Sequence, residues 1–453
     1  MSDPLTGKPE AAARPWDPVA SGSANLFWAK IAGNGGYFVA VLILARGLGP
    51  AGRGTIAFIT VTALVVAHMA GLGVGEATTV LSSRHPARRP LLLANALVYF
   101  LCAGAVAATL AFVALSLSGI EPAGVGTPEL GILALGIFFC AIGEAGYSFL
   151  LGTERLRQLA FVTGCASWFY AAVVLVLWAG PGLTVWGAAL AWAGTEALRS
   201  TVLATLSARG TLVGLPEWRL LAEEIGFGLR LWIGSLARFL NFRTDQILMG
   251  FLATEAALGF YAVAVNVSEV LLYLPSSAAT ALLPVIARTE ARRRGDETLR
   301  AFRSVLFVTA AGVAGAALLG PIVLPMVFGD AFDESVIPFL WLLPGTFGFA
   351  ASAVFSNSLV GSSSPGLSSL GPLVSLTVGF VLDILLIPPY AATGAAAAAS
   401  VAFLVGGGAA LLIYRGLHPF AWRLLVVPHR GDLDVLAALV SPLARAIPRR
   451  SAA

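Results

Sequence analysis

Eight of the charged side chains in or beside the long apolar stretches of this sequence, where an ion costs a few kcal/mol unless it is paired or functional, are candidate functional groups. Four are arginines and four are acids: Arg46, Arg53, Arg238 and Arg243, and Glu144, Glu196, Asp245 and Glu269. A guanidinium group is always charged and can bind an oxyanion through two parallel hydrogen bonds. A carboxylate can take up a proton or a sodium ion. The acids are therefore candidate groups for coupling to a proton or sodium gradient.

The same charges also have structural interpretations. At ~1.5 Å rise per residue, Arg238 and Glu269 both fall near the middle of their apolar stretches. They can form a permanent ion pair between neighbouring helices. Arg46 and Arg53 lie nearer the ends of theirs, so their heads can extend to the membrane surface. The sequence leaves both interpretations open.

The elements that must position these charges are membrane helices. Of the 453 residues, 58% are hydrophobic and 11% are charged, with a mean hydropathy of +0.86. Charge collects between apolar runs of about 20 residues, which is the length needed to cross ~30 Å of hydrocarbon. Uninterrupted runs favour helices over a membrane barrel. We predict an all-α integral membrane protein with about twelve transmembrane helices, near residues 26–46, 55–80, 91–118, 130–152, 158–179, 184–207, 226–250, 258–286, 302–328, 335–360, 367–388 and 392–415.

The loops between these helices alternate in charge, which predicts their orientation. One set carries arginines, as at residues 84–89, 155–157, 209–219 and 288–303, and the other set is acidic or uncharged, as at Glu121, Glu255 and Asp330. Arginine-rich loops remain cytoplasmic. An even number of spans then places both termini in the cytoplasm. Heavy use of Ala, Gly and Arg with only two lysines favours a bacterial source, and hence the bacterial cytoplasmic membrane.

Enzymatic and metal chemistry are not expected. The three cysteines lie in apolar runs without CxxC spacing, so the sequence predicts no zinc site and no disulfide framework. No soluble segment is long enough for a catalytic domain. A membrane glycosyltransferase would need an outer loop with acidic or histidine residues, and the outer loops here are too short.

The two halves of the chain resemble each other. Residues 48–57 match 252–262, with Gly54 opposite Gly259 at a shift of 205, and two further matches have shifts of 207 and 209. Shared apolar composition is the alternative explanation. Parallel repeats form two bundles with substrate held between them. We predict a cytoplasmic N-terminal arm (1–25), an N-lobe (26–207), a cytoplasmic interlobe linker (208–225), a C-lobe (226–415) and a cytoplasmic tail (416–453) that is either amphipathic along 432–447 or disordered.

Five segments carry a resemblance to a known family: ILARGLGPAGRGTIAF (43–58), GLGVGEA (71–77), LARFLNFRTDQILMG (236–250), LGFYAVA (258–264) and ALLPVIAR (281–288). The chain resembles the polysaccharide transporters, or oligosaccharide flippases, of the multidrug/oligosaccharidyl-lipid/polysaccharide (MOP) superfamily over about residues 25–415. The resemblance implies a V-shaped cavity between two six-helix lobes. It also implies transport of undecaprenyl-pyrophosphate-linked oligosaccharide from the inner to the outer leaflet by alternating access, for cell-surface polysaccharide assembly.

With that substrate, the four arginines become a predicted path for the pyrophosphate. The resemblance implies no cofactor and no nucleic acid, and it implies membrane lipids, polysaccharide polymerase and glycosyltransferases as partners. A lipid II flippase or a cation-coupled multidrug exporter of the same superfamily remains an alternative. An excess of arginine in the cavity would favour a phosphate-bearing lipid, whereas an excess of carboxylate would favour a cationic drug.

Overall fold

In the computed structural model the described residues are 17–211, 213–289, 291–361 and 366–425, and within these ranges all regular structure is helical. The predicted all-α class is confirmed. The predicted amphipathic segment 432–447 and most of the N-terminal arm lie outside the described residues. The α-helices are α1 (Asp17–Ala70), α2 (Val74–Arg84), α3 (Arg89–Ser118), α4 (Thr127–Gly152), α5 (Leu156–Ala179), α6 (Val185–Ala208), α7 (Trp218–Leu240), α8 (Thr244–Leu252), α9 (Glu255–Arg288), α10 (Ala291–Phe328), α11 (Val336–Leu342), α12 (Gly345–Gly361) and α13 (Leu370–Leu417).

Several helices do not coincide with single predicted spans. By length and composition, seven helices of the described ranges can cross a membrane, or eight if the bent pair at residues 330–361 counts as one span. Two of the longest helices each cover two predicted spans. The backbone of α1 leaves helical geometry at Gly49 (φ 67°), just before Pro50. The backbone of α13 leaves it at Ala391 (φ 46°), just after two prolines. Proline lacks the N–H donor that helix continuation needs, so both helices kink there.

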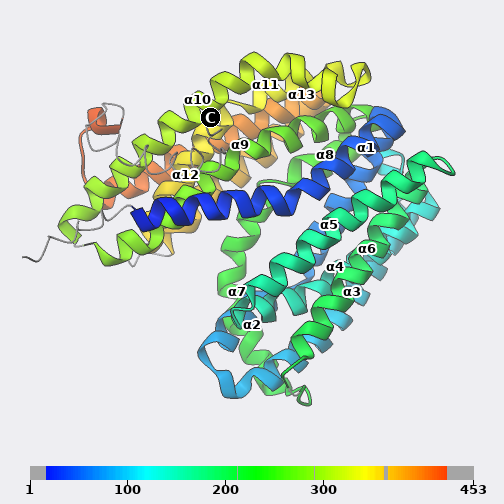
Figure 1. The fold of residues 1–453 in the computed structure, drawn as a ribbon, viewed down its shortest axis with the longest axis horizontal. Coiled ribbons are helices and arrows are strands. Elements are labelled where there is room, and N and C mark those ends of the chain that lie inside the picture. Colours follow the sequence, from blue (N-terminus) through cyan, green and yellow to red (C-terminus); the bar gives the residue numbers. More distant parts are fainter. Residues whose placement is uncertain (1–16, 212, 290, 362–365, 426–453) are drawn as a thin grey trace, which may run out of the picture.

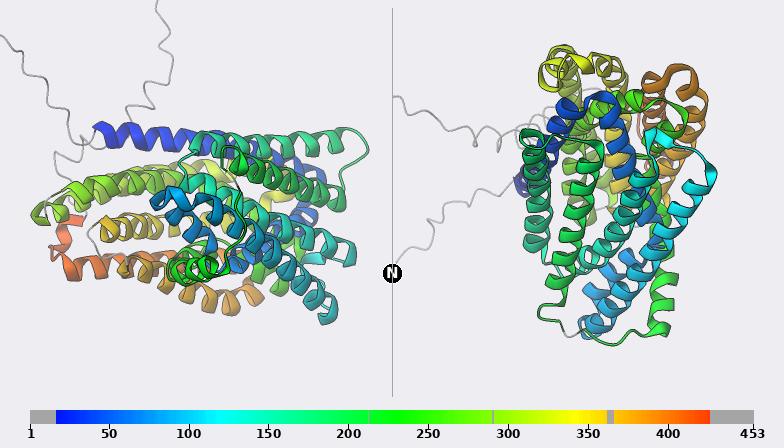
Figure 2. Two further views of the ribbon diagram at one scale, coloured as in Figure 1. Left: turned by 90° about the horizontal axis from the view of Figure 1, so that it is seen from below. Right: turned by 90° about the vertical axis from the view of Figure 1, so that its right-hand side faces the viewer.

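The helices form two arms that converge at one end (Figure 1). The N-lobe arm contains α2 to α6 and the C-lobe arm contains α9 to α13, and helices within each arm run side by side (Figure 2). We call the converging end the acidic end, because the connections at Glu121, Glu129, Glu255 and Asp330 lie there. The separated tips carry the arginine-rich connections and form the basic end.

At the acidic end, α1 crosses α9 with almost no separation. A Cβ atom added to Gly54 would lie 1.9 Å from the carbonyl oxygen of Glu255, and one added to Gly259 would lie 1.9 Å from that of Pro50. Both residue pairs are related by the same shift of 205 (54 to 259, and 50 to 255). The crossing therefore has approximate two-fold symmetry between the repeats.

The seventh predicted span is not one helix. It breaks between α7 and α8, at residues 241–243, so the prediction of a continuous helix over 226–250 is wrong. Trp232 of α7 donates to the carbonyl oxygen of His68 (3.2 Å), and Ser235 donates to the carboxylate of Glu76. Beyond the break, α8 packs against α13. The chain therefore passes from one arm to the other at this break.

A buried carboxyl group lies near the start of α7, two residues before the predicted span. Asn95 of α3 donates to Glu224 (2.9 Å) and also accepts from the backbone N–H of Glu217 (2.8 Å). The side chain of Glu224 is fully buried, and its second carboxyl oxygen has no partner. Burial raises the pKa of Glu224 to about 7.

We expect Glu224→Gln to stabilise the protein more at pH 8 than at pH 5.5. A carboxyl group whose pKa is raised in the folded state makes the protein less stable as pH increases from the group's unfolded pKa through 7, because the folded state must then bury the ion. The shift corresponds to roughly 3 kcal/mol above pH 7. Thermal unfolding in detergent at both pH values measures the effect. An equal gain in melting temperature at both pH values would mean that the stabilisation comes from packing and not from removal of the charge.

Candidate functional site

A cavity of about 900 Å³ lies between the two arms. Its walls come from α1, α4, α5 and α6 on one side and from α8, α9 and the α7–α8 break on the other. Such a volume is within the range of small-molecule sites. The polar lining includes Tyr37, Arg53, Thr60, Glu144, Tyr147, Thr163, Ser167, Tyr170, Thr195, Glu196, Arg199, Arg243, Gln246, Asn266, Glu269 and Tyr273.

On the C-lobe side, Arg243 forms an ion pair with Glu269. Its guanidinium nitrogen lies 2.8 Å from the carboxylate, and both side chains are mostly buried. The sequence instead suggested that Arg238 pairs with Glu269, and this is wrong. A straight helix would have put Arg238 at the depth of Glu269, but the break after α7 redirects the chain and brings Arg243 there.

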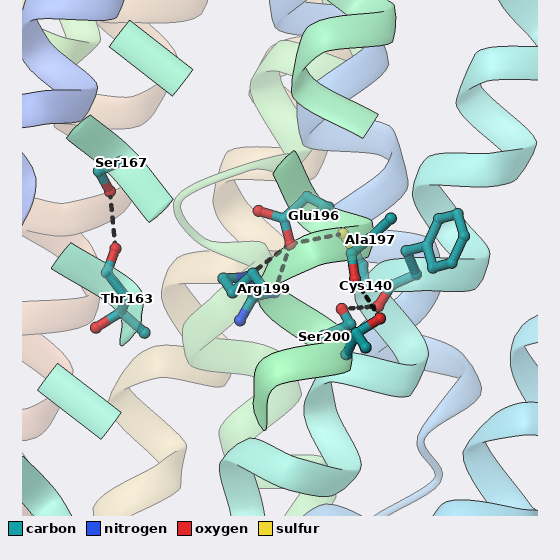
Figure 3. A network of polar contacts seen from close by, with 9 residues as sticks. Cys140, Thr163, Ser167, Glu196, Ala197, Arg199 and Ser200 are labelled. Carbon is teal, nitrogen blue, oxygen red and sulfur yellow. Dashed lines mark hydrogen bonds and ion pairs between the residues drawn. The ribbon is translucent and has the colours of Figure 1, made fainter. Parts of the chain in front are cut away.

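On the N-lobe side, Arg199 and Glu196 form an ion pair within α6, with nitrogen–oxygen distances of 2.5 and 2.8 Å (Figure 3). The thiol of Cys140 also points at this carboxylate (3.8 Å). One turn along, Ser200 donates to the carbonyl oxygen of Phe139 and ties α6 to α4 (2.6 Å). The sequence prediction omitted Arg199, although its i,i+3 spacing from Glu196 was the signal that could have found it.

We expect Arg199→Met to destabilise the protein by about 3 kcal/mol, because it leaves Glu196 as an unpaired charge of low exposure. The double variant Glu196→Gln/Arg199→Met removes both charges and should recover most of the lost melting temperature. Thermal unfolding of the three proteins in one detergent measures this. A double variant no more stable than Arg199→Met would show that the ion pair is not what Arg199 contributes.

Arg53 differs from the other two cavity arginines. Its side chain is 2% exposed, it lines the cavity, and it makes no hydrogen bond or ion pair within the described ranges. The alternative that Arg53 extends to the membrane surface is therefore wrong. A buried guanidinium group without a counter-ion is costly. The cavity wall thus contains one buried cationic group that no carboxylate of the described ranges neutralises.

The formal charge of the lining is balanced. Three arginines (53, 199 and 243) face three glutamates (144, 196 and 269), so neither sign is in excess. Two of the arginines form ion pairs with two of the glutamates. Glu144 has no ion-pair partner in the described chain and accepts only from Ser148 (3.3 Å). The count of charges does not separate a phosphate-bearing lipid from a cationic drug, but the unpaired Arg53 and Glu144 define where each could bind.

The structure does not bring Arg46 to the cavity. At the acidic end, its Nε and Nη2 atoms each donate, at 2.9 Å, to the carbonyl oxygens of Val327 and Met326. These carbonyls belong to the last turn of α10, where a helix lacks intrahelical donors and where a cation is favourable. Arg46 therefore joins α1 to the C-lobe arm where the arms meet.

Two further predicted residues lie on the C-lobe side, outside the central cavity. Arg238 is exposed and lines a second, smaller pocket. Asp245 is buried on α8, where it accepts from the hydroxyl of Tyr261 and from the backbone N–H of Gln246 (2.7 Å). Five of the eight predicted residues thus line the central cavity: Arg53, Arg243, Glu144, Glu196 and Glu269.

Solved structures show which fold this is. An inward-facing multidrug resistance MATE family transporter of the MOP superfamily superposes with a TM-score of 0.70 at 17% identity, covering 84% of this chain and 94% of that one. The lipid II flippase MurJ in an inward closed conformation gives 0.69 at 14% identity, covering 95% and 92%. An outward-facing MATE transporter gives 0.61 at 18% identity, covering 90% and 96%.

Sequence comparison identifies the family. No curated protein sequence matches the chain significantly. The profile of the family described as "Polysaccharide biosynthesis protein" matches residues 43–337, which is well over half of the chain. Apart from four cavity-lining residues before residue 43, the match covers the whole lining of the central cavity. The chain therefore belongs to the polysaccharide biosynthesis protein family, and its fold is that of the MOP-superfamily membrane transporters.

Proposed function

We propose that the chain is a flippase that moves undecaprenyl-pyrophosphate-linked oligosaccharide from the inner to the outer leaflet of a bacterial cytoplasmic membrane. The observation that carries this proposal is Arg53, a buried guanidinium group without a counter-ion in a cavity between two lobes. A diphosphate supplies the missing charge. The family match points to polysaccharide assembly rather than to drug export.

The described conformation is the inward-open one in this proposal. Arginine-rich connections mark the basic end as cytoplasmic, and the arms are separated there (Figure 1). Alternating access then requires the basic end to close and the acidic end to open, which separates α1 from α9 and breaks the contacts of Arg46.

The cavity supports a two-step engagement of the diphosphate. It meets Arg53 first, because this group has no partner to displace. It then competes with Glu269 for Arg243 across their 2.8 Å pair. A carboxylate released from its arginine is left in a poorly hydrated site and takes up a cation. We therefore propose Glu269 as the first candidate for coupling to a proton or sodium gradient, with Glu144, Glu196 and Asp245 as the other candidates.

Reconstituted vesicles test the proposal. Undecaprenyl-diphospho-N-acetylglucosamine is incorporated in both leaflets, and a galactosyltransferase added outside labels only the outward sugars. We expect the labelled fraction to increase from about half to nearly all when the protein is present. Labelling equal to that of protein-free vesicles would count against this flippase activity. Lipid II in the same assay tests the lipid II alternative.

The unpaired Glu144 favours a second candidate, a cation-coupled multidrug exporter. In that case vesicles with an imposed proton or sodium gradient should move ethidium, and Glu144→Gln should stop this movement. Ethidium transport without lipid transport would make the exporter the better assignment.

A further inference from the structure

The C-lobe arm contains its own pocket, separate from the central cavity. It encloses about 380 Å³ between α7, α9, α12 and α13, at the lower end of the range for small-molecule sites. Its walls combine three phenylalanines with hydroxyl, amide and guanidinium groups: Arg238, Asn241, Phe242, Ser276, Thr280, Phe349, Ser352, Ser356, Asn357, Ser375 and Phe403.

Several polar groups in this pocket have no protein partner. Ser375 is 4% exposed, and its hydroxyl oxygen makes no hydrogen bond; the same holds for the hydroxyl oxygen of Ser356. The half-buried Asn357 and the exposed Arg238 also line the pocket, and within the described ranges neither side chain makes a hydrogen bond or ion pair. Buried polar groups are normally satisfied. A pocket with this many free donors and acceptors is suited to a ligand rich in hydroxyl groups.

The aromatic wall suits the same kind of ligand. Phe242 packs against Phe349 and Phe403 with ring centroids 5.6 Å apart in both pairs, and all three rings are half-buried. A sugar ring presents apolar C–H faces as well as hydroxyl groups. It can lie against such rings while its hydroxyls reach the serines and the amide. An acyl chain would leave those polar groups desolvated and unpaired, which is costly.

The pocket also continues the path of the proposed substrate. On α9, Asn266, Glu269 and Tyr273 line the central cavity, and Ser276 and Thr280 line the pocket. These positions recur at intervals of three and four residues, so they share one face of the helix. Ser276 is about 10 Å from Glu269 along the axis, at ~1.5 Å per residue, and lies toward the basic end.

We propose that this pocket binds the sugar adjacent to the diphosphate while the diphosphate occupies the central cavity. The inference rests on the proposed flippase function and deepens it, because it assigns glycan recognition to the C-lobe. Arg53 and Arg243 hold the charge common to all such lipids, and the pocket at Ser375 and Asn357 distinguishes a glycan-bearing lipid from the bare carrier.

Binding to the full chain in lipid nanodiscs tests this assignment. The probes are undecaprenyl diphosphate, undecaprenyl-diphospho-N-acetylglucosamine and undecaprenyl-diphospho-galactose. We expect the wild type to bind at least one glycan-bearing probe about tenfold more tightly than the bare lipid. Ser375→Ala and Asn357→Ala should reduce this ratio to about one and leave affinity for the bare lipid unchanged.

These two variants should fold normally, because neither removed group has a hydrogen bond in the unliganded protein. Thr377→Val, on the exposed face of α13, is the matched control and should keep the wild-type ratio. Unchanged ratios in both pocket variants would overturn the assignment. So would a wild type that binds all three probes equally, although that result leaves the proposed function intact. Failure to bind any diphosphate lipid would instead contradict the proposed function.

Discussion

Replacing Arg53 by glutamine should reduce lipid transport roughly 100-fold, through loss of charge-assisted hydrogen bonds to the diphosphate. The same change should raise the melting temperature. In the unliganded protein Arg53 is 2% exposed and has no counter-ion in the described chain, so its removal relieves a desolvated charge. Vesicle transport and thermal unfolding of one preparation measure both effects, and their opposite signs distinguish a binding residue from a structural one.

Arg53→Lys separates charge from geometry. Lysine keeps the positive charge but cannot form the two parallel contacts of a guanidinium group, so we expect an intermediate transport rate. Arg46→Gln is the comparison at the acidic end. It removes two hydrogen bonds to the end of α10 and should lower stability rather than raise it. Normal transport by Arg53→Gln would remove this residue from the substrate path.

The sequence was sufficient for the fold because hydropathy and charge both follow the membrane. Long apolar runs predicted the helices, and alternating arginine-rich loops matched the two ends of the molecule. Where the prediction failed, the cause was local backbone geometry. The breaks inside predicted spans, between α1 and α2 at residues 71–73 and between α7 and α8 at residues 241–243, depend on backbone geometry and tertiary contacts, neither of which is visible in a hydropathy pattern. The kinks at Gly49 and Ala391, in contrast, fall between predicted spans.

For the same reason, the sequence predicted only part of the central cavity's lining and not its ion pairs. Depth along a helix identified five of the cavity residues, because a charge at that depth must face a polar interior. Depth alone could not assign partners. Arg238 and Arg243 are five residues apart, and only the break between α7 and α8 decides which of them reaches Glu269. Uncharged lining residues such as Gln246 and Asn266 gave no signal, since an amide in a membrane helix is common in helix contacts.

A single methyl group at Gly54 or Gly259 should shift the protein away from the conformation described here. In either variant the new Cβ atom would lie 1.9 Å from a backbone carbonyl oxygen of the opposing lobe. Neither contact can be relieved by a side-chain rotation, so α1 and α9 must separate. Overpacking of this kind costs about 1–3 kcal/mol, which corresponds to a population shift of roughly 5- to 150-fold.

Separation at the acidic end should be visible as closure at the basic end. Spin labels at Gln158 of α5 and Asp296 of α10, both exposed at the basic end, report the distance between the arms after Cys102, Cys140 and Cys165 are replaced by serine. We expect long distances in the parent and shorter ones in Gly54→Ala and Gly259→Ala. Gly131→Ala, where an added Cβ meets nothing within 4 Å, should resemble the parent.

The approximate two-fold symmetry of the α1–α9 crossing predicts the relative effects of the two variants. Gly54 approaches the carbonyl of Glu255, and Gly259 approaches the carbonyl of Pro50, so each variant breaks the repeat-related copy of the other's contact. The two shifts should therefore be similar in size, and the double variant should add little, because one separation of α1 from α9 relieves both overlaps. Unchanged distances in both single variants would mean that this crossing does not control access. Markedly unequal shifts would mean that the repeats do not move as equivalent units.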